Sequence, residues 1–159
     1  VGSETEGGVK NVVVRNVSFE ETDNGIRIKS DRKRGGLVDG FACENITMKN
    51  VRGAITITSY YPRIPETDEA KPVTAKTPKY CNIVLRNVKG TSSKAAGVIV
   101  GLPESHLENV LLENVEITAE QTGLEIRNAK NVELKNVKIT PKKGQPITVK
   151  DADVKGLEK

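Results

Sequence analysis

The sequence predicts an all-β protein: a right-handed parallel β-helix of about five coils, each with three short strands, in a single domain over residues 1–159. Three observations support this. A unit of the form Asn, apolar, any, apolar, any, Asn, apolar recurs five times, at intervals of 22 to 37 residues. Each copy is followed by a second alternating segment. No apolar stripe of 3.6-residue period and no leucine-rich pattern favours another repeat architecture.

The five copies of the unit begin the five predicted coils, at residues 11–17, 45–51, 82–88, 109–115 and 131–137. In the first coil we expect strands at about Val12–Val14, Val17–Phe19 and Ile26–Ile28, because side chains two residues apart point to the same face. Their apolar residues would form the core. Successive coils would stack in parallel about 4.8 Å apart, with right-handed crossovers.

The second asparagine of each unit falls on the apolar phase, at a bend between strands. An unpaired buried amide is costly, so we expect these side chains to hydrogen-bond from coil to coil as a structural ladder. The predicted ladder consists of Asn16, Asn50, Asn87, Asn114 and Asn136.

The third strand of the first coil, Gly25–Ser30, carries the candidate binding residues. Ile26 and Ile28 point inward, so Arg27 and Lys29 stand together on the outer face. The preceding Asp23-Asn24-Gly25 is typical of a turn, in which we expect Gly25 to use its access to positive φ.

The remaining segments have simpler interpretations. The longest insertion lies between Ser59 and Cys81, and residues 151–157 are expected to form a partial last coil. We expect Cys43 and Cys81 to be buried free thiols rather than a disulfide or zinc site. The single histidine, His106, is expected on a surface turn.

Composition excludes several partners. A net charge of +4 favours an anionic partner, yet the 25 basic and 21 acidic residues are interspersed, and aromatic residues make up only 3%. Nucleic-acid binding is therefore not expected. Within the given residues no apolar run is long enough to span a membrane, and we expect no signal peptide, metal or cofactor.

Several segments together resemble the polygalacturonases of glycoside hydrolase family 28, above all the bacterial ones. They are Val1-Gly2-Ser3-Glu4, residues 7–12, Thr22-Asp23-Asn24-Gly25-Ile26-Arg27-Ile28-Lys29-Ser30, Gly35-Gly36, and Ile55-Thr56-Ile57 leading to Tyr60-Tyr61. The resemblance implies an inverting hydrolase of α-1,4-linked galacturonate, extracellular or periplasmic. It implies that Arg27 and Lys29 grip a sugar carboxylate and that Tyr60 or Tyr61 contacts substrate. Arg offers a planar fork and Lys a point charge for this purpose.

The sequence departs from the family in its catalytic residues. The family's catalytic aspartates and its Gly-His-Gly histidine belong to coils that would precede Val1, and nothing here matches them. Glu4, Glu6, Asp23 and Asp31 lie in predicted turns and are not expected to be catalytic, and His106 has no acid-base partner. We therefore expect the C-terminal portion of a longer solenoid, inactive alone.

Two functions remain open from the sequence. One is the substrate-binding half of a pectin-degrading hydrolase. The other is a non-catalytic solenoid module, isolated or engineered, that binds acidic polysaccharide. In either case the strands of the first coil would lack a covering layer, and we expect self-association through that N-terminal end.

Overall fold

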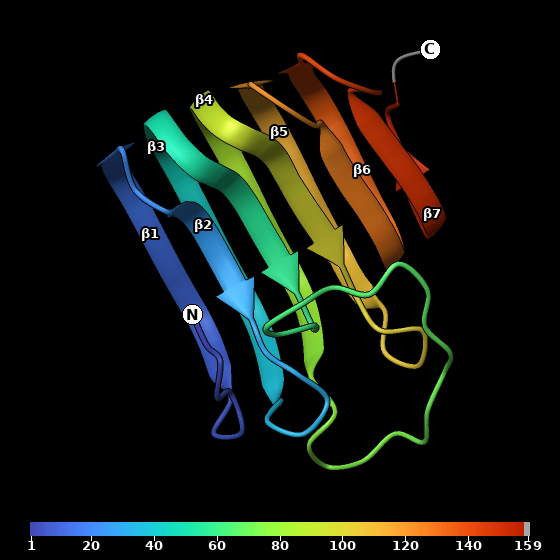
Figure 1. The fold of residues 1–159 in the computed structure, drawn as a ribbon. Helices are drawn as coiled ribbons and strands as arrows, with labels where there is room; N and C mark the ends of the chain where they lie inside the picture. The colour runs from blue at the N-terminus through green and yellow to red at the C-terminus, as the bar shows by residue number, and fades with distance from the viewer. Residues whose placement is uncertain (158–159) are drawn as a thin grey trace.

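The computed structural model describes residues 1–157, which contain seven β-strands and no helix (Figure 1). The described residues accordingly include no helix that is long and apolar enough to cross a membrane. In chain order the strands are β1 Val9–Glu20, β2 Asn24–Lys29, β3 Leu37–Thr58, β4 Lys79–Val100, β5 Leu107–Ala119, β6 Leu124–Pro141 and β7 Ile147–Lys155.

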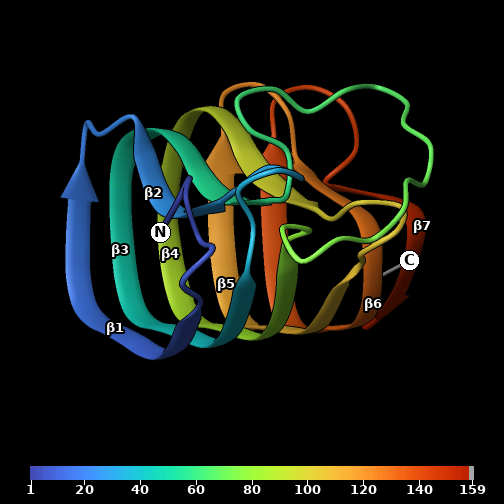
Figure 2. The ribbon, with the colours of Figure 1, turned by 90° about the horizontal axis from the view of Figure 1, so that it is seen from below.

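The strands wind into a parallel β-helix, as the sequence predicts. All pairings between them are parallel, in the order β1-β3-β4-β5-β6-β7, while β2 also pairs with β3. The end of β4 pairs with the start of β6, because one coil is completed by the strand that begins the next. Figure 2 shows the coils side by side in sequence order, each curved around a common interior.

The interior contains the predicted aliphatic side chains. Ile26 and Ile28 are buried, as are Ile55 and Ile57 one coil further on. Val12, Val14, Val17 and Phe19 of β1 pack against this core but remain half-buried. They stay half-buried because, in the described part of the chain, β1 pairs with β3 alone.

The asparagine ladder exists, but its second member and its environment were predicted wrongly. Its hydrogen bonds, from amide Nδ2 to the Oδ1 of the preceding coil, are 2.9 to 3.1 Å long and connect Asn16, Asn45, Asn87, Asn114 and Asn136. Asn45 occupies the position predicted for Asn50, because the strand register aligns Val17 with Ile46. The ladder residues are exposed and not buried as expected, so their hydrogen bonds are not needed to satisfy amides hidden from water.

Backbone geometry explains why asparagine recurs. Both asparagines of every unit lie at bends with φ between 51° and 57°. Such left-handed geometry is disfavoured for most side chains and tolerated by asparagine. A second amide ladder runs from Asp39 through Asn82 and Asn109 to Asn131.

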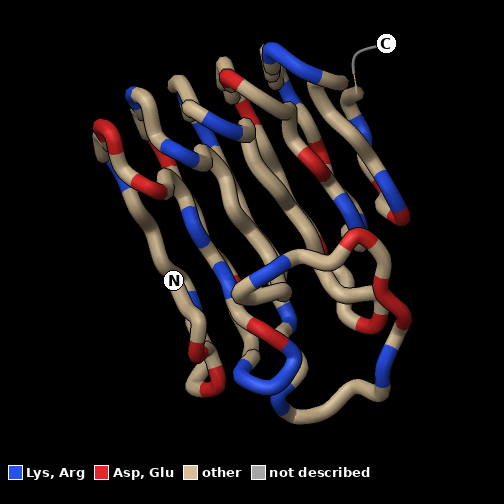
Figure 3. The backbone as a smooth tube through the Cα atoms, in the orientation of Figure 1, with Lys and Arg blue, Asp and Glu red and all other residues tan. Residues whose placement is uncertain are grey.

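Charged residues also align from coil to coil. Arg15, Glu44, Arg86 and Glu113 occupy one column of the strand register, with the sign alternating at each step. Glu44 contacts Arg15 at 2.8 Å and Arg86 at 3.4 Å, and Arg86 contacts Glu113 at 2.5 Å. Basic and acidic segments are correspondingly interspersed over the coils (Figure 3).

Two further expectations are corrected. Gly25 does not have a positive φ; it is needed because a Cβ there would lie 2.6 Å from both the carbonyl oxygen of Ala54 and the sulfur of Met48. Cys43 is buried as predicted, whereas Cys81 is only half-buried; both are free thiols. Burial raises the pKa of Cys43 to about 11.

Candidate functional site

Arg27 and Lys29 lie on β2 with their side chains on its outer face, because Ile26 and Ile28 fill the inward positions. In the register Arg27 is opposite Thr56 and Lys29 is opposite Thr58 of β3. The pairing holds the two cations on a rigid strand rather than on a mobile loop.

Tyr61 completes this group. Lys29 Nζ lies 3.6 Å from the centroid of the Tyr61 ring, and the guanidinium carbons of Arg27 and Arg34 lie 5.9 and 5.7 Å from it. These are cation–π distances. The chain therefore gathers three cations around one aromatic ring at the ends of β2 and β3.

The three cations differ in their ion pairing. Arg34 binds Asp31 at 2.6 Å and Glu4 at 2.5 Å. Within residues 1–157, neither Arg27 nor Lys29 forms an ion pair, and the Nε of Arg27 is buried without a hydrogen-bond partner. Two fixed cations without a carboxylate are suited to receive an anion from solution.

Tyr60 points away from this group and is buried to 8% exposure in the loop that follows β3. Its hydroxyl donates a 2.6 Å hydrogen bond to Asp68, and Arg32 also binds Asp68 and reaches Glu104 at 2.5 Å. The structure thus separates the two tyrosines: Tyr61 joins Arg27 and Lys29, and Tyr60 anchors the loop.

The pKa values in this anchor follow from its contacts. Burial raises the pKa of Tyr60, and its hydrogen bond to Asp68 raises it further. Burial alone would raise the pKa of Asp68 and Glu104, but hydrogen bonds from Arg32 to both, and from Tyr60 to Asp68, hold each pKa below its ordinary value. Asp68 and Glu104 are therefore ionised near neutral pH, while the hydroxyl of Tyr60 keeps its proton and can donate it in the hydrogen bond.

Arg127 fastens the loop at a second point that sequence reasoning missed. It donates hydrogen bonds of 2.9 Å to the carbonyl oxygens of Pro65 and Glu66. Its side chain is 9% exposed and its Nε lies 3.4 Å from Glu125. The sequence held one clue to its place on the outer face. Apolar and charged residues alternate over 124–127, and this puts Arg127 at the position that Lys29 has in the first coil.

The acidic residues near the site are held by arginine and lysine. Glu4 and Asp31 bind Arg34, Glu6 lies 3.2 Å from Lys76, and Asp23 lies 3.8 Å from Arg52. The Arg34 and Ser3 hydrogen bonds lower the pKa of Glu4. Burial opposes a similar lowering at Asp31, but hydrogen bonds from the Lys33 backbone and Arg34 outweigh it. A general acid needs the opposite shift.

Comparison with known proteins identifies the family. The profile of glycosyl hydrolases family 28 matches residues 1–138. The chain belongs to this family. An endo-polygalacturonase of Pectobacterium parmentieri is 34% identical over 124 residues, covering 77% of this chain and 28% of the relative. No solved structure matches significantly.

Two further relatives are also polygalacturonases. A polygalacturonase of Ralstonia nicotianae is 36% identical over 94 residues, covering 55% of this family 28 chain and 16% of the relative. A polygalacturonase of Medicago sativa is 36% identical over 98 residues, covering 60% and 23% respectively. The chain thus spans less than a third of the length of these relatives.

Proposed function

We propose that this family 28 chain carries the carboxylate-binding part of a polygalacturonase-type site and binds galacturonate units of pectin. The carrying observation is the pair Arg27 and Lys29, which face outward beside Tyr61 without an ion-pair partner among the described residues. An anionic sugar supplies the missing charge. Pectin is a cell-wall polymer, so we place the protein outside the cell, extracellular or periplasmic.

Each residue has a distinct role in the proposal. The guanidinium of Arg27 offers a planar donor fork to a carboxylate, and Lys29 adds a point charge two residues further along the same face of β2. The Tyr61 ring, 3.6 Å from Lys29 Nζ, holds that ammonium in place and offers its edge to a sugar ring. A bound uronate would be positioned by charge and confined by the tyrosine.

Hydrolysis by this chain alone is not expected. An inverting glycosidase needs an acid and a water-activating carboxylate about 6.5–9.5 Å apart across the bond. The nearby acids Glu4 and Asp31 are paired with Arg34 and have lowered pKa values, which disfavours the protonated form that a general acid needs. The proposal therefore assigns binding to these residues and leaves catalysis outside them.

The test measures binding and turnover separately. Trigalacturonate is titrated by calorimetry into the wild-type chain, Arg27→Ala, and Lys33→Ala as a control in which an exposed lysine outside the site is removed. We expect Arg27→Ala alone to weaken binding, by up to about fivefold for an exposed pair, and added salt to weaken it in the wild type. Equal binding by the wild type and Arg27→Ala would refute the proposal.

Turnover is measured as reducing-sugar release from polygalacturonate, which should be absent for the wild-type chain. If the wild type released sugar and Arg27→Ala did not, the catalytic acids would lie within this chain.

A further inference from the structure

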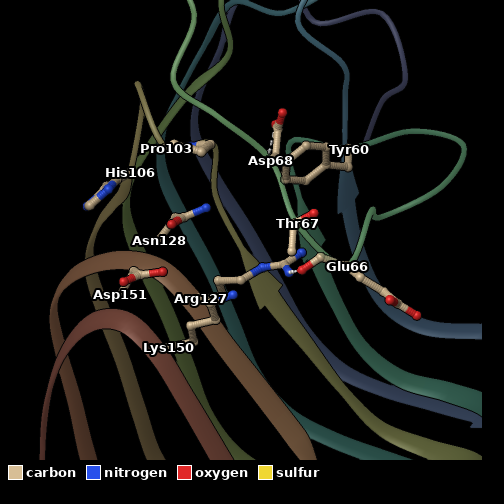
Figure 4. A pocket seen from close by; sticks show the side chains of 10 residues that line it. All are labelled: Tyr60, Glu66, Thr67, Asp68, Pro103, His106, Arg127, Asn128, Lys150 and Asp151. Atoms are coloured by element: carbon tan, nitrogen blue, oxygen red, sulfur yellow. Dashed lines mark hydrogen bonds between the residues drawn. The ribbon is translucent and has the colours of Figure 1, made fainter.

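A pocket lies several coils away from Arg27 and Lys29, beside the bends that follow Arg127 in β6 and Lys150 in β7. It has a volume of about 330 Å³, near the lower limit for small-molecule sites and suited to a single sugar unit. Figure 4 shows how the loop after β3, the turn before β5 and the bends that follow Arg127 and Lys150 enclose it. Family membership does not assign it a role.

The strand register connects this pocket with the first site. The column that begins at Lys29 continues through Thr58, Val100, Arg127 and Lys150. Three steps of about 4.8 Å put Arg127 roughly 14 Å from Lys29 along the helix axis. Cations therefore mark both ends of one column, with uncharged residues between them.

The middle of that column is covered by the loop. Tyr60 packs on Val100 and Leu102, with Ile64 beside them. Residues 66–68 line both this pocket and a more open hollow of about 630 Å³ that contains Arg32, Arg63 and Lys71. The loop is thus a ridge, and the pocket beyond it is separate from the Arg27–Lys29 group.

Polar groups in the pocket are held in place and not fully used. Arg127 is 7% exposed, its terminal nitrogens are fixed by two loop carbonyls, and its buried Nε forms no hydrogen bond and has only the carboxylate of Glu125 nearby, at 3.4 Å. The ring nitrogen Nδ1 of His106 is also buried without a partner in the described chain. The sequence predicted His106 as a surface residue, but it is half-buried and lines this pocket.

The bend at the pocket floor is equally rigid. Asn128 is 6% exposed, has a φ of 50°, and donates a 3.0 Å hydrogen bond to the carbonyl oxygen of Gly101. One coil further on, Lys150 and Asp151 are exposed and also line the pocket. The buried Nδ1 of His106 is costly to leave unpartnered, and a bound ligand or a water would offset that cost.

We propose that this pocket binds one acidic sugar unit, separately from the Arg27–Lys29 site. Lys150 would pair with the carboxylate, while His106 and Asp151 would hydrogen-bond the hydroxyl groups and Arg127 would hold the loop that forms one wall. That the ligand is a uronate rests on the proposed function, whereas the existence of a ligand site in this pocket does not depend on it. Two sites separated by a ridge would let one pectin chain be held at two points, which raises its effective affinity.

His106 is the only histidine in the chain, so its imidazole signals in NMR spectra report on this pocket alone. The probes are galacturonic acid and, as the neutral comparator, galactose, at constant pH. We expect saturable shifts of the His106 ring signals with galacturonic acid and not with galactose. Lys150→Ala should weaken the response by up to about fivefold, and Lys143→Ala, an exposed lysine elsewhere, should leave it unchanged.

A double variant, Arg27→Ala with Lys29→Ala, separates the two proposals. The His106 shifts should persist in this variant. The backbone signals of residues 26–30 should shift with galacturonic acid in the wild type and no longer respond in the variant. Wild-type shifts at residues 26–30 alone would retain the proposed function and overturn this pocket. Shifts at His106 alone would do the reverse. Equal response to galactose, or loss of the His106 shifts in the double variant, would also overturn it.

Discussion

The hydroxyl of Tyr60 donates a 2.6 Å hydrogen bond to Asp68, and Arg32 binds the same carboxylate while also holding Glu104. The Tyr60–Asp68 hydrogen bond connects the residue just after β3 to a residue inside the long insertion that follows it. It fixes the loop as a ridge between the two hollows described above.

The loop should loosen in acid. The pKa values of Asp68 and Glu104 lie below their ordinary values of about 3.9 and 4.3, so their contribution to stability is complete above those values and is lost as the pH falls through the lower folded pKa values. Hydrogen exchange of residues 62–76 should therefore change little from pH 7 to 5 and accelerate below about pH 4, with residues 83–88 as the internal control. Asp68→Asn should exchange faster already at pH 7. If the exchange rates of residues 62–76, corrected for the intrinsic effect of pH, were the same at every pH, this prediction would be wrong.

The asparagine bends should be sensitive to substitution in a graded way. Asn87→Ala removes two amide contacts and puts alanine at a φ of 54°, so we expect it to lower the free energy of unfolding by about 1–3 kcal/mol. Asn87→Gly keeps the backbone geometry and should cost less. Asn50→Ala, at a φ of 51° but outside the ladder, tests the backbone contribution alone. Urea denaturation measures all three, and an Asn50→Ala loss as large as that of Asn87→Ala would argue that the amide ladder adds nothing.

Gly25 should not accept a side chain. A Cβ there would lie 2.6 Å from the Ala54 carbonyl oxygen, so Gly25→Ala should destabilise the protein by about 1–3 kcal/mol through overpacking. Gly7→Ala is the matched control, because nothing lies within 4 Å of its position, and it should change stability by no more than about 0.5 kcal/mol. Thermal unfolding followed by circular dichroism compares the two. Similar melting temperatures for both variants would be inconsistent with the packing described.

The first coil should promote self-association of this chain. β1 pairs on one side only within the described residues, its Val13 is 52% exposed, and Val12 and Val14 are half-buried. Open strand edges with apolar neighbours favour pairing between molecules. Sedimentation velocity at rising concentration should show dimers or larger species, and Val13→Lys should reduce them. A monomer at all concentrations would refute the expectation.

The two cysteines should differ in reactivity. Burial raises the pKa of Cys43 to about 11, and burial followed by the charge of Asp39 raises that of Cys81, so both thiols are protonated near neutral pH. Cys81 is half-buried and should react slowly with a disulfide reagent in the folded protein. Cys43 should react only after unfolding. Two equivalents of rapid reaction under native conditions would contradict the burial of Cys43.

Much of this architecture could be predicted from periodicity. The alternation at Gly25–Ser30 was sufficient to place Ile26 and Ile28 inside and Arg27 and Lys29 outside, because a strand has only two faces. Repetition of the asparagine unit identified a solenoid. The repeat alone could not determine which asparagine of the second coil belongs to the ladder, because Asn45 and Asn50 both fit the pattern. Only the pairing between coils selects Asn45.

The loop and its consequences were less accessible. Tyr60 and Tyr61 are adjacent in the sequence and equivalent as aromatic residues, yet Tyr60 contacts Asp68 and Tyr61 contacts Lys29. Arg127 could be placed on a strand, but its hydrogen bonds to Pro65 and Glu66 depend on a contact across more than sixty residues. Local patterns carry no information about such a distant partner.

The alternating column of Arg15, Glu44, Arg86 and Glu113 imposes a parity rule on any whole-coil deletion. Excising the second coil would bring Arg15 opposite Arg86, and two stacked guanidinium groups would repel each other. Excising the second and third coils together would instead bring Arg15 opposite Glu113 and restore attraction. Where this column dominates, the solenoid can be shortened by pairs of coils more readily than by single ones.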